Sequence, residues 1–569
     1  MAALAVTELC RNNDENKTNA AENGAISLLI EQLKDGQKAR QDIVQAEAAG
    51  AIWVLSENHE ANKLAVEGKR GIAPTVNLLA SNNIRAQKHA ANALASLGHD
   101  NSENQTQITE LLVNLLGTGN PHAKSNAATT LWRIVQENSE SQQKIAKAGP
   151  TSELISLLKV GTDQAKEYAL WALSLSINEG NQSVLLDEDG IEPLVAALTA
   201  PLTITKQQAA AALASLALDN SKAQVAIAKA GSIRPLIKIV KETRGGEPEA
   251  IAAREQAAAA LAQLAIVPGN RDEVVEAGGI DPLVEQVQTG EPMSQKFAAA
   301  AIARLAKGNQ LNQTTIADAG AIPSLVQLLG GERGEPAQEE AAGALFELAD
   351  DADNRISITK AKGIEPVVQL LGASNPKARR HAEGALVRLS IESANRVIII
   401  NKLVGMLRQT SNAAQEQAAA ALANLASDSA ENRNSIVDAG GIVPLITLFE
   451  SSSAKAKENA VAAIAKLAHK SEGIQAAIAS AGGIPKLGNV LIQSSANVKD
   501  LTAAQLCSIA ASAVSALAEG NKANAVAIAD AGAVTPLVGM LASPSPELQS
   551  NSAGALAQLS HLSFENQVS

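Results

Sequence analysis

The sequence predicts an all-α fold in which short helices stack in series around a thin core. Three observations support this prediction: a repeat that recurs along the chain, a near absence of aromatic residues, and an alanine-rich segment in each repeat. Aromatic residues make up 1% of the 569 residues, whereas a single large core uses aromatic rings to fill its centre. Small aliphatic side chains are sufficient where each repeat packs only against its neighbours.

The repeat is recognised by Ala-Gly followed by an aliphatic residue and Pro-Leu, as in residues 277–283 and 439–445. We take the aliphatic position as the anchor of each unit, which gives thirteen units. The step is 42 residues in six of the twelve intervals and 36 to 50 in the others, a period typical of repeats of two or three helices. The anchors are Ile26, Ile72, Thr109, Thr151, Ile191, Ile233, Ile280, Ile322, Ile364, Ile400, Ile442, Ile484 and Val534.

Each unit is expected to contain three helices, as the segment from residue 417 to 449 illustrates. Residues 434–438 form a short first helix, and the glycine that follows can adopt the left-handed conformation that ends a helix. Pro444 falls near the start of the second helix, where its missing N–H costs nothing. The third helix is alanine-rich, as in residues 417–426, so neighbouring third helices can approach closely. Thr109 and Ile400 lack the Ala-Gly turn, and we expect a degenerate first helix in these two units.

These units resemble armadillo repeats, and the resemblance covers essentially the whole chain. It implies an armadillo-type α-solenoid, a right-handed superhelix of three-helix repeats, as a single array over residues 1–569. Residues 1–13 fit the third helix of a preceding repeat, and residues 565–569 fit the start of a further repeat. The alternative is that these half-repeats are terminal caps.

Composition excludes several classes of function. The net charge of −12 repels polyphosphate and disfavours nucleic acid as a partner. Two cysteines provide no disulfide framework, which favours the cytoplasm or the nucleus. The sequence contains no run of eighteen apolar residues, so we expect no membrane span. The seven histidines are scattered and no phosphate-binding loop occurs, so we expect no catalytic residues, metal site or cofactor.

The resemblance also implies where a partner would bind. In armadillo proteins the third helices line a concave groove, and nuclear-import adaptors place a Trp four residues before an Asn on each of them. Only Trp171 matches the Trp position here, and only Asn424 matches the Asn position, which disfavours a nuclear-import adaptor. Trp53 and Trp132 fall one place before the Asn position and are expected to face elsewhere.

The candidate groove therefore consists of other residues at the Asn position and at four and seven residues before it, which share a helix face. We expect amides in this set to hydrogen-bond the backbone of an extended peptide. Arg133, Arg304, Arg388 and Lys466 at the Asn position, against Glu347, predict a preference for acidic segments. The candidate residues are Tyr168, Trp171, Gln208, Gln256, Gln263, Arg304, His381, Arg388, Gln417, Asn424, Asn459 and Lys466.

The favoured function is a non-enzymatic scaffold or adaptor that binds an extended peptide or protein partner along this groove. In this respect the chain resembles vacuolar-membrane armadillo scaffolds and the armadillo arrays of plant U-box ubiquitin ligases. The alternative is the substrate-binding segment of a larger ubiquitin ligase or another multidomain enzyme. Apolar faces on the terminal helices predict end-to-end self-association.

Overall fold

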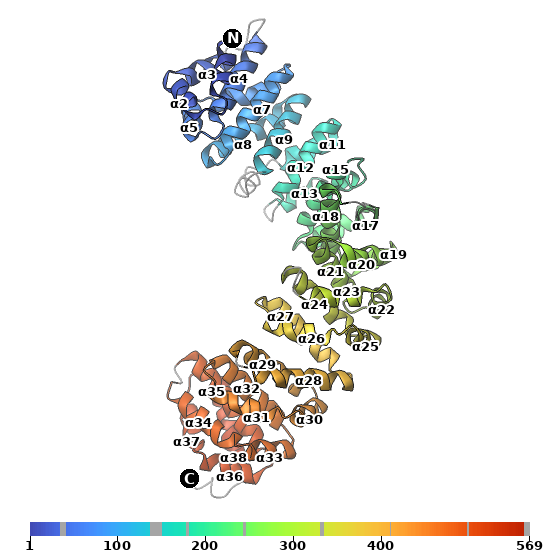
Figure 1. Ribbon diagram of the computed structural model, residues 1–569, viewed down its shortest axis with the longest axis vertical. Helices are drawn as coiled ribbons and strands as arrows, with labels where there is room; N and C mark the ends of the chain where they lie inside the picture. The colour runs from blue at the N-terminus through green and yellow to red at the C-terminus, as the bar shows by residue number, and fades with distance from the viewer. Residues whose placement is uncertain are drawn as a thin grey trace. The chain divides into compact units, whose positions relative to one another are not determined.

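The computed structural model describes residues 1–34, 41–136, 151–177, 181–242, 246–330, 335–409, 411–497 and 500–562. Helices are the only regular elements in these ranges (Figure 1), which confirms the all-α fold. The chain divides into two compact units, Met1–Arg304 and Leu305–Ser569, called unit 1 and unit 2 below. One array over residues 1–569 stays a prediction, and residues 565–569 lie outside the described ranges.

Unit 1 contains the helices of the first seven anchors, grouped here by their place in the repeat. The first helices are α2 (Asp14–Glu22), α5 (Glu60–Gly68), α13 (Gln182–Asp187), α16 (Ser221–Lys229) and α19 (Pro268–Glu276). The second helices are α3 (Ala25–Lys34), α6 (Ile72–Asn77) with η1 (Leu78–Ala80), α11 (Thr151–Val160), α14 (Ile191–Ala197), α17 (Ile233–Glu242) and α20 (Ile280–Thr289). The third helices are α1 (Ala2–Cys10), α4 (Gln41–Ser56), α7 (Ile84–Gly98), α9 (Pro121–Gln136), α12 (Asp163–Ser176), α15 (Thr203–Ala217), α18 (Pro248–Leu264) and α21 (Pro292–Ala306).

Unit 2 follows the same order. Its first helices are α22 (Gln310–Asp318), α25 (Ala352–Lys360), α30 (Ala430–Asp438), α33 (Glu472–Ser480) and α36 (Lys522–Asp530). Its second helices are α23 (Ala321–Leu328), α26 (Ile364–Gln369) with η2 (Leu370–Gly372), α31 (Ile442–Thr447) with η3 (Leu448–Glu450), α34 (Gly483–Ser495) and α37 (Val534–Met540). Its third helices are α24 (Glu335–Leu348), α27 (Pro376–Leu389), α29 (Asn412–Asp428), α32 (Ala454–Ala468), α35 (Leu501–Ala518) and α38 (Pro546–Leu562).

Third helices pack against third helices within each unit. In unit 1, α4 contacts α7 and α12 contacts both α9 and α15; in unit 2, α32 lies between α29 and α35. Figure 1 shows α24 and α27 on the opposite side of unit 2 from the first helices α22 and α25. The third helices therefore share one side of each unit, which we call the third-helix face.

The turn between first and second helices has the predicted glycine geometry. Gly278 and Gly440 have φ angles of +75° and +72°, the left-handed region that glycine adopts without a steric cost. The expectation of degenerate first helices at Thr109 and Ile400 is wrong. In these units α8 (Ser102–Thr118) and α28 (Ser393–Leu407) are single helices that replace the first and second helices. Without the glycine the helix has no signal to end, so it continues through the anchor.

The core of each unit consists of aliphatic side chains and alanine. Leu213 on α15 and Leu422 on α29 are completely buried, with an exposed fraction of 0%. Alanines on the same helices are buried against neighbouring third helices, as the close approach of small side chains requires. Phe449 in η3 is the one aromatic side chain of the described residues that is fully buried in this core.

In many repeats an asparagine in the first helix forms a hydrogen bond to the preceding third helix. The Asn62 Nδ2 atom donates to the carbonyl of Leu55 at 2.9 Å, near the end of the preceding third helix. Asn312 and Asn432 make the equivalent bonds to Leu305 and Leu425, at 2.9 and 3.0 Å. All three asparagines are at least 97% buried, so these bonds satisfy groups that water cannot reach.

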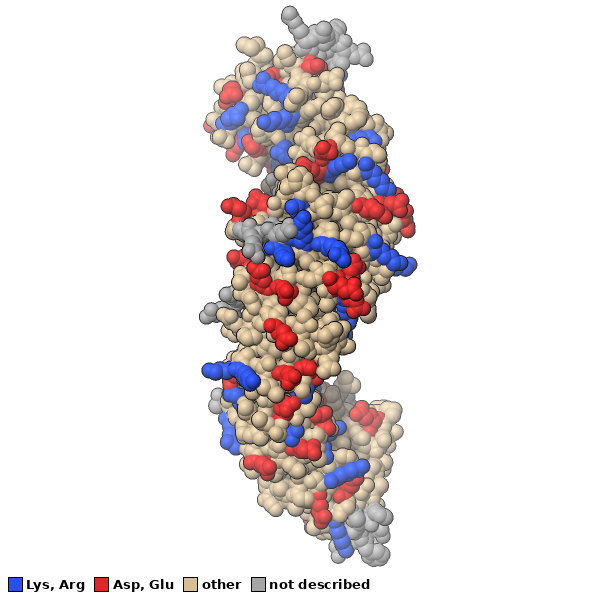
Figure 2. Space-filling model, turned by 90° about the vertical axis from the view of Figure 1, so that its right-hand side faces the viewer, with Lys and Arg blue, Asp and Glu red and all other residues tan. Residues whose placement is uncertain are grey.

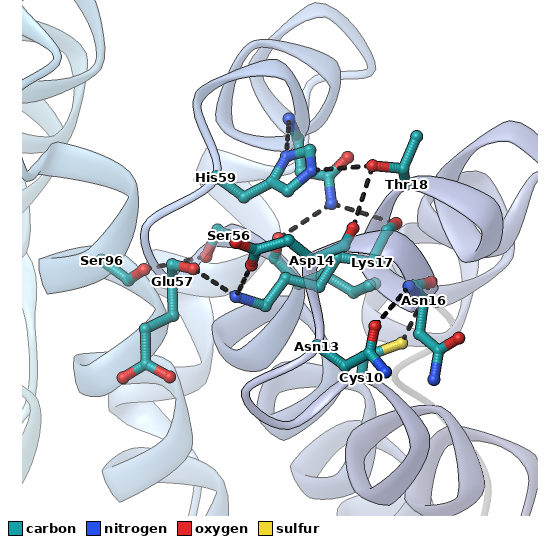
Figure 3. Close-up of polar contacts among 12 residues, drawn as sticks. Cys10, Asn13, Asp14, Asn16, Lys17, Thr18, Ser56, Glu57, His59 and Ser96 are labelled. Atoms are coloured by element: carbon teal, nitrogen blue, oxygen red, sulfur yellow. Dashed lines mark hydrogen bonds and ion pairs between the residues drawn. The ribbon is translucent and has the colours of Figure 1, made fainter.

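The residue after this asparagine is often Lys, Arg or Gln, and its side chain binds the end of a third helix. Figure 3 shows Lys17 of α2 between Asp14 and the end of α4. Its Nζ donates to Asp14 Oδ1 at 2.8 Å and to the Glu57 carbonyl at 2.7 Å. Gln313 donates to the Ala306 carbonyl at 3.0 Å. These side chains satisfy carbonyls at helix ends and are therefore structural.

By length and composition, α35 could cross a membrane, and α36 with α37 could form one span if their 84° bend is ignored. Half of the apolar stretch of α35 is buried, and the helix packs between α32 and α38 as the third helix of its repeat. Its apolar character is therefore accounted for by the core of unit 2.

Candidate functional site

Aromatic side chains concentrate on the third-helix face. Six of the seven described aromatic residues lie on third helices, and each is partly exposed. Partly exposed aromatic rings are the side chains most enriched at protein interfaces. In a chain with so few of them, this placement marks the third-helix face as the candidate binding surface. The six residues are Trp53, Trp132, Tyr168, Trp171, Phe297 and Phe346.

Three of these rings form a cluster in unit 1, which we call the aromatic cluster. The ring centroids of Trp132 and Trp171 are 4.9 Å apart, and those of Trp132 and Tyr168 are 6.1 Å apart. Tyr168 and Trp171 meet edge to face at 5.3 Å. The expectation that Trp132 faces elsewhere is wrong, because its indole ring extends from α9 to α12.

The contact between Trp132 and Tyr168 recurs in other repeats. The residue before the Asn position meets the residue seven before the Asn position of the next repeat. Trp53 lies 6.4 Å from His89 in unit 1, and Phe346 lies 6.2 Å from His381 in unit 2, between ring centroids. The sequence interpretation missed this pairing, although each member falls at a fixed place relative to the Asn position of its repeat.

Glycine stands at the Trp position in two repeats where these rings need space. A Cβ atom on Gly384 would lie 2.6 Å from the Phe346 ring, and one on Gly50 would lie 2.7 Å from His89 Nδ1. Both glycines stand at the Trp position of their repeats. At these two Trp positions the space is therefore occupied by rings from neighbouring repeats.

The amide side chains of the predicted groove are only partly available to a ligand. Asn459 Nδ2 donates to the Glu416 carbonyl at 3.0 Å, and Gln208 Oε1 accepts a bond of 2.6 Å from Ser174. Each of these side chains keeps part of its amide for a ligand, but the repeat interface uses the rest. Among the described residues, the side chains of the other three glutamines of the predicted set form no intramolecular hydrogen bond and are partly exposed: Gln256, Gln263 and Gln417.

The basic residues at the Asn position differ in environment. Arg388 Nε binds Asp350 Oδ1 at 2.8 Å, and its Nη1 lies 3.6 Å from Glu347 Oε2. The guanidinium also covers the Phe346 ring, 3.5 Å from its centroid, and Nη1 donates to the Phe346 carbonyl. This geometry neutralises Arg388. Arg304 is half-buried, whereas Asn424 and Lys466 are exposed on α29 and α32.

Burial changes the titration of two groups beside Phe346. It raises the pKa of the Glu347 carboxyl above its ordinary value, an effect that the Arg388 charge only partly offsets. It also lowers the pKa of His381, while the carboxylate of Glu339 acts in the opposite direction. Desolvation disfavours the charged form in both cases. The α24–α27 surface is thus a packed, largely self-neutralised patch.

Catalytic chemistry finds little support in the described ranges. They contain no group of three or more His, Cys, Asp or Glu residues placed to hold a metal ion. Burial raises the pKa of the Cys507 thiol to about 11 and also raises that of Cys10, so neither is an activated nucleophile. Figure 2, viewed from the side of α22 and α25, shows charges of both signs interspersed on that face of unit 2.

Comparison with known proteins agrees with this architecture. The family model of the Armadillo/beta-catenin-like repeat matches residues 268–307, 309–350, 429–469 and 521–561. These four segments are armadillo repeats. A crystal structure of an engineered protein matches 79% of this armadillo chain and 98% of its own length, with a TM-score of 0.55 and 28% identity.

Two relatives carry more specific names. The U-box domain-containing protein 12 of Arabidopsis thaliana is 35% identical over 106 residues, which are 18% of this chain and 16% of the relative. The probable importin subunit alpha-A of Dictyostelium discoideum is 32% identical over 101 residues, 18% of each chain. The armadillo chain spans a fifth or less of the length of the curated relatives it matches.

Proposed function

We propose that this armadillo protein is a non-enzymatic scaffold whose third-helix face binds extended polypeptide segments in each unit. The observation that carries the proposal is the placement of six partly exposed aromatic side chains on third helices, while the core is aliphatic. Aromatic side chains bury a large area with little loss of conformational entropy, so they commonly anchor a bound partner. Armadillo repeats imply protein partners in general; the extended segment and the third-helix face are our proposal.

The aromatic cluster is the proposed anchor in unit 1. Trp132 and Tyr168 belong to adjacent third helices, so a segment crossing α9 and α12 would contact both rings. Partly exposed amides such as Gln256 could pair with the backbone of the segment without reading its side chains. The scaffold is proposed to act in the cytoplasm or nucleus, because its two cysteines are free and buried.

A peptide array tests this proposal. Acidic, neutral and basic peptides of about twelve residues are probed with the wild type and with Trp132→Ala/Tyr168→Ala. We expect peptides that bind unit 1 to lose about tenfold or more in affinity when both anchors are removed. Val160→Ala is the control, because Val160 is 83% exposed but lies on the second helix α11.

Circular dichroism shows whether each variant keeps its helical fold. Binding that survives the double change, or that the Val160 control weakens equally, would overturn the anchor role of the cluster. Stronger binding of basic peptides would contradict the proposed acidic preference and favour the import-adaptor alternative that the importin relative suggests.

Two finer points belong to the same proposal. The alternative of a substrate-binding segment of a larger ubiquitin ligase is favoured by the U-box relative, and the complete coding transcript decides it.

Self-association through α1 would cover Leu9, which is 65% exposed, together with Met1 and Leu4. Sedimentation at rising concentration tests this, and a strict monomer would contradict it.

A further inference from the structure

Unit 1 contains a polar cleft of about 590 Å³ beside the aromatic cluster. It is lined mainly by residues of α7 and α9, together with Ala80 of η1 and Gln164 of α12. Eleven of the fourteen described residues that line it are polar or charged, and none of these fourteen is Asp or Glu. Three carry or can carry positive charge: Lys88, His122 and Arg133. A cleft whose described charged residues are all basic stands out in a chain of net charge −12.

Arg133 is held in place without being neutralised. Its Nη1 donates to Asn92 Oδ1 at 2.6 Å, and Asn92 is itself 91% buried. Among the described residues, no carboxylate forms an ion pair with Arg133, Lys88 or His122. The neutral amide orients the guanidinium and leaves its charge and its other N–H groups to the cleft.

The start of α9 adds to the positive character of the cleft. Asn120 caps this 16-residue helix by accepting a bond of 2.9 Å from the Ala123 N–H. The first turn contains no acidic residue, so the positive end of the helix dipole is not offset there. Asn120 and His122 both line the cleft, which brings the helix end and the side-chain charges to one place.

The cleft is continuous with the aromatic cluster along α12. Gln164, Tyr168 and Trp171 are spaced at i, i+4 and i+7 and therefore share one face of this helix. On α9, Arg133 follows directly after Trp132. A segment seated on the aromatic rings would thus bring an adjacent side chain to the cleft.

We propose that this cleft binds an anionic side chain, a phosphoryl or carboxylate group, of a polypeptide segment anchored on the aromatic cluster. Guanidinium and ammonium groups form strong charge-assisted bonds with both anions, and the neutral amide and hydroxyl groups around them can complete the shell. The proposal rests on the proposed peptide-binding function and specifies its ligand chemistry in unit 1.

The test uses one randomised peptide library of about twelve residues with a central Ser, phosphoserine or Asp. Binding to the full chain is measured for the wild type and for Arg133→Gln/Lys88→Gln. The glutamine at position 133 can still donate to Asn92, which protects the fold. Lys241→Gln removes an exposed charge at the end of α17, away from the cleft, and is the charge-matched control.

We expect peptides with phosphoserine or Asp to bind about five- to tenfold more tightly than their Ser counterparts. The preference should disappear in the double variant and persist in the control. The phosphoserine and Asp arms distinguish the two anions, and inorganic phosphate should compete with the favoured peptides. Rising salt should weaken the preference, because the charges involved are partly exposed.

The outcomes separate this inference from the proposed function. If peptides bind through Trp132 and Tyr168 but the central residue makes no difference, the anion site is wrong and the peptide-binding function stands. If the preference survives in Arg133→Gln/Lys88→Gln, the anion binds elsewhere and the inference is overturned. If no peptide binds, whatever its charge, both proposals fail.

Discussion

Arg133 in unit 1 and Arg388 in unit 2 stand at the same position of the repeat but have different neighbours. The guanidinium of Arg133 meets the neutral amide of Asn92 and lines an open cleft. The guanidinium of Arg388 meets the carboxylates of Glu347 and Asp350 and lies over the Phe346 ring, 3.5 Å from its centroid. Two arginines that look equivalent in the repeat therefore contribute an available charge in one unit and a neutralised charge in the other.

Part of the difference lies in the Asn position of the preceding repeat, and the rest in Asp350, which binds Arg388 at 2.8 Å. Unit 1 has Ser96 there, before Arg133, whereas unit 2 has Glu347 before Arg388. Because third helices pack side by side, residues at this position in consecutive repeats lie within reach of each other. The residue type at one position is therefore a poor guide to function until the neighbouring repeat is considered with it.

The largest expected effect tests whether a destabilising substitution in one unit leaves the stability of the other unit unchanged. Leu422→Ala in α29 should destabilise unit 2 by about 2–5 kcal/mol, because Leu422 is completely buried and its loss leaves a cavity. Stacked repeats contact only their neighbours, so amide hydrogen exchange should rise around α29 and stay unchanged in unit 1. An equal rise in both units would mean that the faces cannot be compared as separate sites.

A second prediction concerns the packing that neutralises Arg388. Gly384→Ala should be about 1–3 kcal/mol less stable than Gly343→Ala, because its Cβ would lie 2.6 Å from the Phe346 ring. Gly343→Ala is the matched control: its Cβ would lie 3.5 Å from His381, an ordinary contact, and alanine favours the helix. Thermal or denaturant unfolding measures both variants. Equal stability would show that the Phe346 ring moves aside freely.

Much of the fold could be predicted because a few neighbouring residues determine where a helix ends. The glycine before each anchor gave the turn, as Gly278 and Gly440 confirm with their positive φ angles. The same logic failed at Thr109 and Ile400, where loss of the glycine fused two helices instead of degrading one. The buried Asn62 and its equivalents were missed, although Asn followed by Lys, Arg or Gln recurs in most first helices.

The candidate site was less predictable, because the position of a residue on a helix indicates where its side chain points but not how far the side chain extends. Trp132 was assigned to another face from its position, but its indole ring spans to the next third helix. Asn459 was expected to pair with a peptide, yet part of its amide binds the Glu416 carbonyl. Both observations concern contacts between consecutive third helices, which depend on side-chain length and on the neighbouring repeat; the pairing of Asn459 with a peptide stays a prediction.

The smallest expected effect comes from exchanging the residues beside Arg133 and Arg388. This exchange tests directly whether these neighbours cause the difference between the two arginines. Ser96→Glu should place a carboxylate beside Arg133 and weaken the binding of acidic peptides to unit 1. Glu347→Ser/Asp350→Asn should release Arg388 and strengthen acidic binding to unit 2. Each partly exposed charge contributes roughly 0.2–1 kcal/mol, so the affinities should change by about fivefold or less and should depend on salt.

Titration of acidic peptides by fluorescence anisotropy measures both variants, with Ser96→Gln as the uncharged control for the first. Ser96 is partly exposed, so the longer side chain has room and its charge is the main change. If Ser96→Glu and Ser96→Gln weaken binding equally, size and not charge controls the cleft. If releasing Arg388 leaves the affinity of unit 2 unchanged, the stacking on Phe346 alone keeps that guanidinium unavailable, and the carboxylates are not what separates the two arginines.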